Sequence, residues 1–302
     1  GSAWQDVAAQ AKAITERGLD SRHFLLCTDD SHAETIFTGH MDRVTRVAIA
    51  AGVPPVTAIQ MATLNTAEHF GVSREVGSIA PGRVADILFV DNLDDFHAQT
   101  VLAKGTLVAR DGHSLLEQKP YPYPAWATNS VKLARKLTTK DFKIRVNSQV
   151  SSTPAGHNVR CHVIGVVENQ APTRHLVLEL PVESGEIRIP DTLHLTPDTP
   201  NVAKLALVER HRASGDVTVA LVSGFGLTEK CAIASTVAHD CHHMLVLGTD
   251  EACMAQAANR LGETGGGQVV VMDGKIIGKV ELPIAGLMSN ERAEVVAQKA
   301  AT

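Results

Sequence analysis

The sequence predicts an α/β region, then a small β unit, then a separate α+β region. Three observations lead to this prediction. Residues 24–27 form a short apolar run that ends at two carboxylates and has amphipathic helical patterns on both sides. After Gly77 the helical spacing gives way to short strands and turns. At residues 120–124 prolines alternate with tyrosines, which is typical of an extended, semi-rigid connector.

The composition restricts the class of protein. The 302 residues are enough for two or three domains, and 44% hydrophobic with 20% charged residues is ordinary for a globular protein. A net charge of −5 gives no electrostatic reason to expect nucleic acid or an acidic membrane as a partner. No apolar run approaches the roughly 20 residues of a membrane span, and the first helical segment is too polar for a signal peptide. The five cysteines are scattered without a Cys-x-x-Cys pair, so we expect a reducing cytoplasm and no disulfide framework.

The pattern of residues 1–75 predicts one buried strand among helices. The apolar run at 24–27 is the expected strand. Residues 65–68, Asn-Thr-Ala-Glu, have the form of a capping box at the start of a small helix. Helices packed behind a single strand are typical of the last quarter of a (β/α)8 barrel. Helical spacing is found at residues 7–14, 41–51 and 56–62.

Two carboxylates follow the expected strand, and two interpretations of them remain open. Catalytic and metal-binding groups of α/β enzymes lie where strands end, at the rim of the barrel or sheet. By this interpretation Asp29 is a catalytic, metal-binding carboxylate. Asp is also a preferred N-cap of helices, so Asp29 and Asp30 could simply cap the next helix, which is the more common outcome for this spacing.

Residues 76–120 predict a small β unit. A Pro-Gly turn at 81–82 precedes a strand at 87–90, and two further strands flank Gly105. We interpret Asp86 as a turn carboxylate. The prolines that follow are interpreted as a crossing between domains, with a ligand for an SH3-type module as the alternative.

Residues 125–302 predict an α+β region. The Gly-Gly-Gly run at 265–267 lacks the pattern of a phosphate-binding loop. We expect strands near 159–167, 175–180, 205–208, 217–222 and 268–272, and helices at 249–261 and 290–301.

A second polar cluster lies in this last region. His239, Asp240, Cys241, His242 and His243 are consecutive and precede an apolar strand. Imidazole and carboxylate groups suit first-row metals. In an extended strand, alternate residues face opposite ways, so a single ligand set would require a bend. A metal site and a solvated histidine-rich turn both remain open, and the other histidines, which are scattered singly, are taken as ordinary.

Several short motifs, among them CTDDSH at 27–32, GHMD at 39–42 and AHDCHH at 238–243, resemble one enzyme family, the bacterial adenine deaminases of the amidohydrolase superfamily. The segments CTDDSH at 27–32, GHMD at 39–42 and AIQMATLN at 58–65 resemble the end of the barrel in that family. The segment GSIAPGRVAD at 77–86 is similar to the return into the small β domain across the superfamily. The segments AHDCHH at 238–243 and LPIAGLM at 282–288 resemble the extra carboxy-terminal domain of adenine deaminases.

The resemblance implies a domain organisation. Residues 1–75 would be the last part of the metal-dependent barrel, 76–120 the small composite β domain, and 125–302 the carboxy-terminal α+β domain. The family's His-x-His pair from the first strand, its middle-strand ligand and its later histidines have no counterpart before Asp29. The resemblance therefore implies the carboxy-terminal part of the enzyme, with the amino-terminal half of the barrel as partner and a homo-oligomer as the assembly.

The resemblance also implies an activity. It is the metal-dependent hydrolysis of adenine to hypoxanthine and ammonia in purine salvage, with manganese or iron as the metal and zinc as the alternative. Asp29 matches the last-strand aspartate, which would bind metal and move protons. A non-catalytic fragment that needs its amino-terminal partner, an enzyme acting on another cyclic amine or amide, and a pure binding module remain alternatives. Substrate-contact candidates are Asp30, His32, His40, His239, Asp240 and His242.

Overall fold

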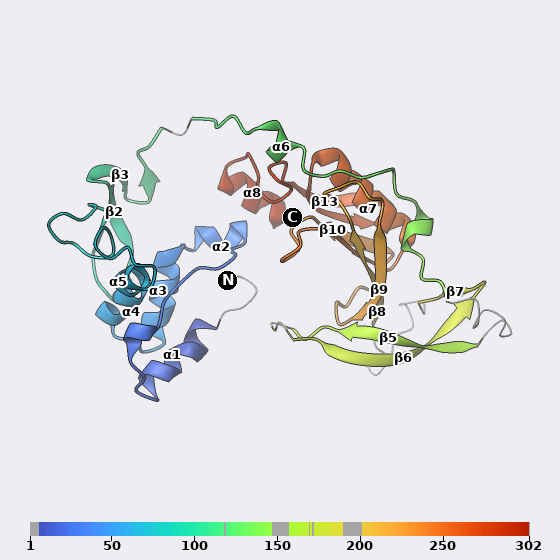
Figure 1. Ribbon diagram of the computed structural model, residues 1–302, viewed down its shortest axis with the longest axis horizontal. Helices are drawn as coiled ribbons and strands as arrows, with labels where there is room; N and C mark the ends of the chain where they lie inside the picture. Colours follow the sequence, from blue (N-terminus) through green and yellow to red (C-terminus); the bar gives the residue numbers. More distant parts are fainter. Residues whose placement is uncertain are drawn as a thin grey trace. The chain divides into compact units, whose positions relative to one another are not determined.

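The computed structural model describes residues 6–117, 119–146, 157–168, 170, 172–189 and 201–301. It contains two compact units, Gly1–Tyr121 and Pro122–Thr302. The division falls inside the proline-rich stretch (Figure 1). The first unit includes both the expected barrel end and the small β region.

The first unit begins with short helices around a small apolar core. Residues of the core come from several helices and from the segment that precedes Asp29; they include Ala11, Leu26, Val44, Ala48 and Met61. The elements are α1 (Val7–Thr15), the 3-10 turn η1 (Ser21–His23), α2 (Ala33–Phe37), α3 (Met41–Ala50), α4 (Pro55–Ala62) and α5 (Leu64–His69).

The strand expected at residues 24–27 is not formed. The segment is extended at Phe24, and the Leu26 side chain is buried in the core, as its apolar character predicted. The backbone N–H of Leu26 donates to the carbonyl of Met61 in α4 at 3.2 Å rather than to a neighbouring strand. A ladder requires a second strand alongside, and no described residue of the chain supplies one here.

Asn65 holds the segment before Asp29 in place. The pattern at 65–68 predicted that Asn65 begins a capping box, but the helix α5 begins after Thr63. The side-chain amide of Asn65 is buried and donates to the carbonyls of Ser21 and Phe24, at 2.9 and 3.2 Å. The capping-box interpretation is therefore wrong, because the amide is used for a long-range contact that fixes the entry to the Asp29 loop.

A four-stranded antiparallel meander completes the first unit. The carboxylate of Asp86 accepts the backbone N–H of Lys104 at 2.7 Å, which fixes the turn between two of its strands. This confirms that Asp86 is a structural carboxylate. The strands, in the order β1-β2-β3-β4, are β1 (Ile87–Val90), β2 (Ala98–Ala103), β3 (Thr106–Arg110) and β4 (His113–Ser114).

The second unit is built on a nine-stranded sheet with the order β13-β12-β10-β11-β8-β9-β5-β6-β7. Neighbouring strands are antiparallel, except that β5 and β9 are parallel. All five strands expected from the sequence are present. The strands are β5 (Asn158–Gly165), β6 (Arg174–Glu183), β7 (Glu186–Ile187), β8 (Val202–Val208), β9 (Val217–Ser223), β10 (Cys231–Ser235), β11 (Met244–Gly248), β12 (Gly267–Met272) and β13 (Lys275–Glu281).

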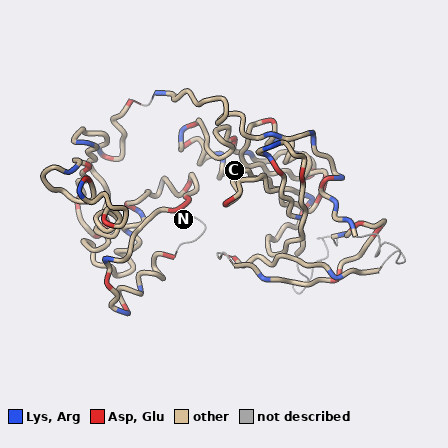
Figure 2. Tube along the Cα trace, viewed as in Figure 1, with Lys and Arg blue, Asp and Glu red and all other residues tan. Residues whose placement is uncertain are grey.

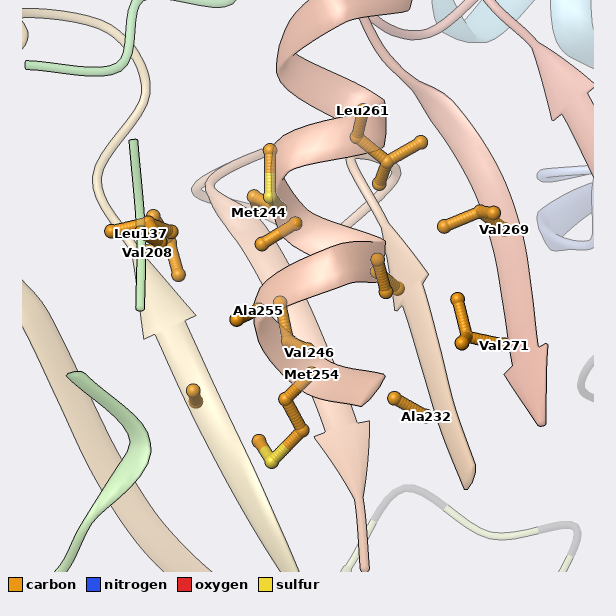
Figure 3. Packing of buried hydrophobic residues seen from close by; sticks show 14 of the residues in the cluster. Leu137, Val208, Ala232, Met244, Val246, Met254, Ala255, Leu261, Val269 and Val271 are labelled. Atoms are coloured by element: carbon orange, nitrogen blue, oxygen red, sulfur yellow. The ribbon is translucent and has the colours of Figure 1, made fainter. Parts of the chain in front are cut away.

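Helix α7 (Glu251–Thr264) covers one face of this sheet and closes the main core. Its side chains pack on β10, β11 and β12 (Figure 3). Asp250 caps its start by accepting the N–H of Cys253 at 2.9 Å, and Gly265, in the left-handed conformation, ends it. Shorter helical elements of the unit are α6 (Ala125–Thr128), η2 (Thr139–Phe142) and α8 (Ala293–Ala300).

Charged residues of both signs are interspersed along each unit (Figure 2). Within the described ranges, no helix is both long and apolar enough to cross a membrane.

Candidate active-site residues

Asp29 lies on an exposed loop between the core segment and α2. Its backbone has a φ of +52°, an uncommon conformation for a residue with a side chain. Its carboxylate accepts the backbone N–H of Asp30 at 2.6 Å. Helix α2 begins after His32, which occupies the N-cap position. The helix-cap interpretation is therefore wrong for Asp29, whose exposed carboxylate can meet a ligand or a partner.

The other candidates of the first unit lie close to Asp29 in the chain. Asp30 and His32 share its loop, and both are exposed. His40 is exposed at the N-cap of α3, and its backbone N–H donates to Asp42 at 2.7 Å. Asp30, His32 and His40 are thus carried on loops that open onto the surface of the unit.

An ion pair stabilises the loop that carries His40. Arg46 donates to the carboxylate of Asp42 at 2.6 Å and to the carbonyl of Thr38 at 2.8 Å. Partial burial raises the pKa of Asp42, but the hydrogen bonds from Arg46 and the His40 backbone outweigh it and leave the pKa below its usual value. Asp42 is therefore held in its ionised form and fixes the loop that carries His40.

Asp29 does not belong to a complete metal centre formed by the described residues. Among the described residues, no group of three or more His, Cys, Asp or Glu side chains is placed to hold a metal ion. Since a protein usually supplies at least three ligands to a catalytic metal, the described residues do not fit a divalent metal on their own.

The second polar cluster forms a turn rather than a strand. We call residues 238–243 the histidine turn; it connects β10 to β11. The N–H of His242 donates to the carbonyl of Ala238 at 2.6 Å, which closes the turn. His239 and Asp240 are exposed, and the rings of His239 and His242 meet edge to face with centroids 5.9 Å apart. The bend that a ligand set would need is present, but these residues do not group as a metal site.

The hairpin between β8 and β9 brings two residues to this turn that the sequence did not single out for function. His211 donates through Nε2 to the carbonyl of Cys241 at 3.0 Å, and its ring centroid lies 4.8 Å from that of His243. Arg210 donates from Nε to the carbonyl of His242 at 2.6 Å. Because β8 pairs with β11, the end of β8 must lie beside the turn. That pairing was not predictable from local pattern.

A cavity of about 440 Å³, lined by residues with charged and polar side chains, adjoins the same hairpin. Glu209 lies in its wall and accepts the backbone N–H groups of His211, Arg212 and Ser214, at 2.5 to 3.0 Å. Burial raises the pKa of Glu209, but these hydrogen bonds dominate and lower it to about 2. Glu209 is thus an ionised anchor for the hairpin. The cavity is lined by Glu209, His211, Arg212, Ser214, Asp216 and His243.

Comparison with known proteins covers both units. Residues 4–112 match the amidohydrolase family, and residues 170–302 match the adenine deaminase C-terminal domain. "Adenine deaminase 3" of Rhizobium meliloti is 53% identical over 99% of this chain, and "Adenine deaminase" of Mesorhizobium japonicum is 54% identical over 99%. "Adenine deaminase" of Moorella thermoacetica is 42% identical over the whole chain. In each case the match covers 48% of the relative.

The chain is similar along both of its units to proteins named adenine deaminase, and its two matched segments are those of the amidohydrolase family and of the adenine deaminase C-terminal domain. It spans about half the length of the curated relatives that it matches and corresponds to their carboxy-terminal portion. The resemblance inferred from short motifs is thereby confirmed. Asp29 lies in the segment that matches the amidohydrolase family, and the histidine turn lies in the segment that matches the adenine deaminase C-terminal domain.

Proposed function

We propose that the complete protein is a metal-dependent adenine deaminase, which hydrolyses adenine to hypoxanthine and ammonia in purine salvage. The observation that carries this proposal is an identity of about half over 99% of the chain with proteins named adenine deaminase. The matched C-terminal domain supports the substrate more than the amidohydrolase match does, because the latter family is the broader of the two. The scattered cysteines support a cytoplasmic enzyme.

We propose the domain boundaries that the motifs implied. Residues 1–75 are then the last part of the barrel, residues 76–120 the small β domain, and residues 125–302 the carboxy-terminal domain. The helices α1 to α5 around an extended apolar segment support the first assignment. That segment could pair as a β-strand if the other strands of a barrel lay beside it.

Asp29 is proposed as the proton carrier. Hydrolysis requires water to add at C6 of adenine and the exocyclic amine to leave as ammonia. A carboxylate next to the attacking water accepts its proton and returns it to the ring or to the departing nitrogen, first as general base and then as general acid. The exposed Asp29 carboxylate, whose described hydrogen bond comes from the neighbouring backbone, leaves room for that exchange.

A divalent metal, manganese or iron with zinc as the alternative, is proposed as the cofactor. Such a metal lowers the pKa of bound water towards about 7. Because the described residues do not form a ligand group by themselves, Asp29 would be one ligand and the amino-terminal half of the barrel would supply the rest.

Six polar residues are proposed as substrate contacts. Asp30, His32 and His40 lie on loops near Asp29 in the chain, and their polar side chains suit the ring nitrogens of a purine. His239, Asp240 and His242 are proposed to close the pocket over the purine or to receive the leaving ammonia. The exposure of His239 and Asp240 on the histidine turn supports this role.

The amino-terminal half of the enzyme is proposed as the partner of the first unit, within a homo-oligomer. Large apolar side chains of this unit are exposed to solvent. Ile79, which is 79% exposed, and Phe70 have the largest exposed fractions among them. An amino-terminal half that covers these side chains would explain why they are exposed in this chain. The chain without that half is then the inactive assembly module that the sequence left open as an alternative.

The test is a substitution in the complete enzyme. Asp29→Asn keeps the size of the side chain and removes its basicity, so hypoxanthine formation from adenine should fall by about 10²- to 10⁴-fold. Glu34→Gln is the matched control, because it neutralises an exposed carboxylate in the first turn of α2, and it should leave turnover unchanged. A complete enzyme that releases no hypoxanthine or ammonia from adenine would contradict the proposed substrate, and an unaffected Asp29→Asn would contradict the proposed residue.

A further inference from the structure

Arg210 is a charged side chain in an unusual position. It follows β8 and is 1% exposed. Its hydrogen bonds to described residues end on carbonyl and hydroxyl oxygens, and no described carboxylate forms an ion pair with it. Glu209, the preceding residue, acts on Arg210 electrostatically, but the guanidinium itself donates to neutral oxygens of three segments. Its hydrogen bonds therefore fix the placement of those segments.

The guanidinium connects three segments that are far apart in the chain. Its Nε donates to the carbonyl of His242 in the histidine turn at 2.6 Å. Its Nη2 donates to the carbonyl of Ala285 at 3.2 Å, and its Nη1 lies 3.4 Å from the carbonyl and hydroxyl oxygens of Ser130. A planar side chain with five donors is suited to such a junction, whereas the ammonium of lysine lacks this fixed fork.

The loop at residues 284–288 is shaped to fit this junction. Gly286 has a φ of +70°, and a Cβ there would lie 2.8 Å from Nη1 of Arg210. The buried hydroxyl of Thr236 donates to the carbonyl of Gly286 at 2.5 Å and accepts the N–H of Gly267 at 2.8 Å. The loop is thus held from both sides, by the guanidinium and by the threonine at the start of the connection from β10.

These contacts join the two segments that resembled the carboxy-terminal domain of the family, 238–243 and 282–288. We propose that Arg210 is a positioning residue for adenine deamination, because it fixes the histidine turn to the 284–288 loop. The inference rests on the proposed function, in which the turn covers the purine. Arg210 reaches the turn through the backbone of His242 and not through the imidazole, so it acts on the placement of His239, Asp240 and His242.

The first test compares variants in the complete enzyme. Arg210→Met keeps the length of the side chain without its donors, and Arg210→Lys keeps the charge without the fork. We expect kcat/KM for adenine, per folded enzyme with unchanged metal content, to fall about tenfold to a hundredfold in Arg210→Met, the scale of a small misplacement of reacting groups. The decrease in kcat/KM should be smaller in Arg210→Lys. Arg212→Met, on the exposed side of the same hairpin, is the control and should not change kcat/KM.

A double-mutant cycle separates positioning from stability. If Arg210 acts through the turn, Arg210→Met combined with Asp240→Asn costs less than the sum of the two single effects. Additive effects, or an Arg210→Met enzyme that melts at a lower temperature but keeps its kcat/KM, would overturn the inference. If the Arg210→Met enzyme does not fold, Gly286→Ala takes its place in the cycle. The added methyl group would displace the Arg210 guanidinium from the 284–288 loop.

Hydrogen exchange supplies a reading that does not depend on activity. The amide of His242, bonded to the carbonyl of Ala238, should exchange at least tenfold faster in Arg210→Met than in Arg212→Met. Equal exchange in the two variants would show that Arg210 does not hold the turn. An inactive parent enzyme would instead overturn the proposed function, and the exchange result would still decide whether Arg210 fixes the turn.

Discussion

The two units of the molecule differ in how completely they bury their large apolar side chains. In the second unit, α7 lies on a nine-stranded sheet, and Phe142, Met244, Met254 and Leu261 are almost completely buried. In the first unit, short helices enclose a small cluster, while a long series of large apolar side chains remains exposed. That series includes Leu19, Ile36, Val56, Phe70, Val72, Ile79, Leu88, Phe89 and Leu93.

The difference teaches which unit depends on residues outside the chain. Folding must bury enough apolar surface to offset lost conformational entropy. The second unit does so with its own sheet and helix. The first unit has an extended apolar segment without a paired strand and a four-stranded sheet with two edges. We infer that its missing contacts are made by the amino-terminal half of the enzyme, which also fits the match to about half the length of the relatives.

The largest expected effect tests this comparison through one substitution in each unit. Met254 on α7 is fully buried, so Met254→Ala should lower the free energy of unfolding of the second unit by about 2–5 kcal/mol. Ile79, in contrast, is 79% exposed. Ile79→Ser should change the stability of the chain alone by less than about 0.5 kcal/mol. Urea unfolding followed by circular dichroism measures both.

The same two substitutions can also be compared in the presence of the amino-terminal half. If that half covers Ile79, Ile79→Ser should destabilise the complete enzyme although it leaves the chain alone unchanged. If Ile79→Ser changes the free energy of unfolding neither in the chain alone nor in the complete enzyme, Ile79 is not part of the covered surface. If Met254→Ala leaves the free energy of unfolding unchanged, the second unit does not have the tightly packed core described here.

A smaller effect is expected from Glu209 and depends on pH. The pKa of Glu209 lies at about 2 in the folded state, below its ordinary 4.5, because three backbone N–H groups donate to the carboxylate. A depressed pKa stabilises the fold above the unfolded value, and this contribution is lost as the pH falls from about 4.5 to 2. Glu209→Gln should therefore flatten the loss of stability over that range, with the exposed Glu168→Gln as control. An unchanged pH profile would contradict the assignment of Glu209 as an ionised anchor.

Part of the first unit followed from local pattern and part did not. The apolar run at 24–27 predicted burial correctly, since Leu26 lies in the core. It did not predict the pairing, because a ladder depends on a second strand that local sequence does not reveal. Asn65 was assigned to a cap from its spacing to Glu68, yet its amide holds the Ser21 and Phe24 carbonyls. The role proposed for Asp29 was based on its place after the apolar run and on the family resemblance, and the described residues show no group of metal ligands that could support it.

In the second unit most elements were predictable, apart from β7, β10 and β13, and the order of the strands was not. Alternating apolar residues located the strands, and Asp250 and Gly265 mark the ends of α7. The pairing of β8 with β11 brings Arg210 to the carbonyl of His242, 32 residues further along the chain, and leaves no local signal. The five-residue polar cluster was visible in the sequence, but its turn conformation follows from the antiparallel pairing of β10 and β11.

The most direct test is hydrogen exchange of the chain, first alone and then with the amino-terminal half of the enzyme, together with an assay for hypoxanthine. The account predicts strong protection of β10, β11, β12 and α7 in both states. It predicts weak protection of residues 6–75 alone, a large gain there on assembly, and adenine deamination only after assembly. Strong protection of residues 6–75 in a monomer of the chain alone, or no gain on assembly, would contradict it.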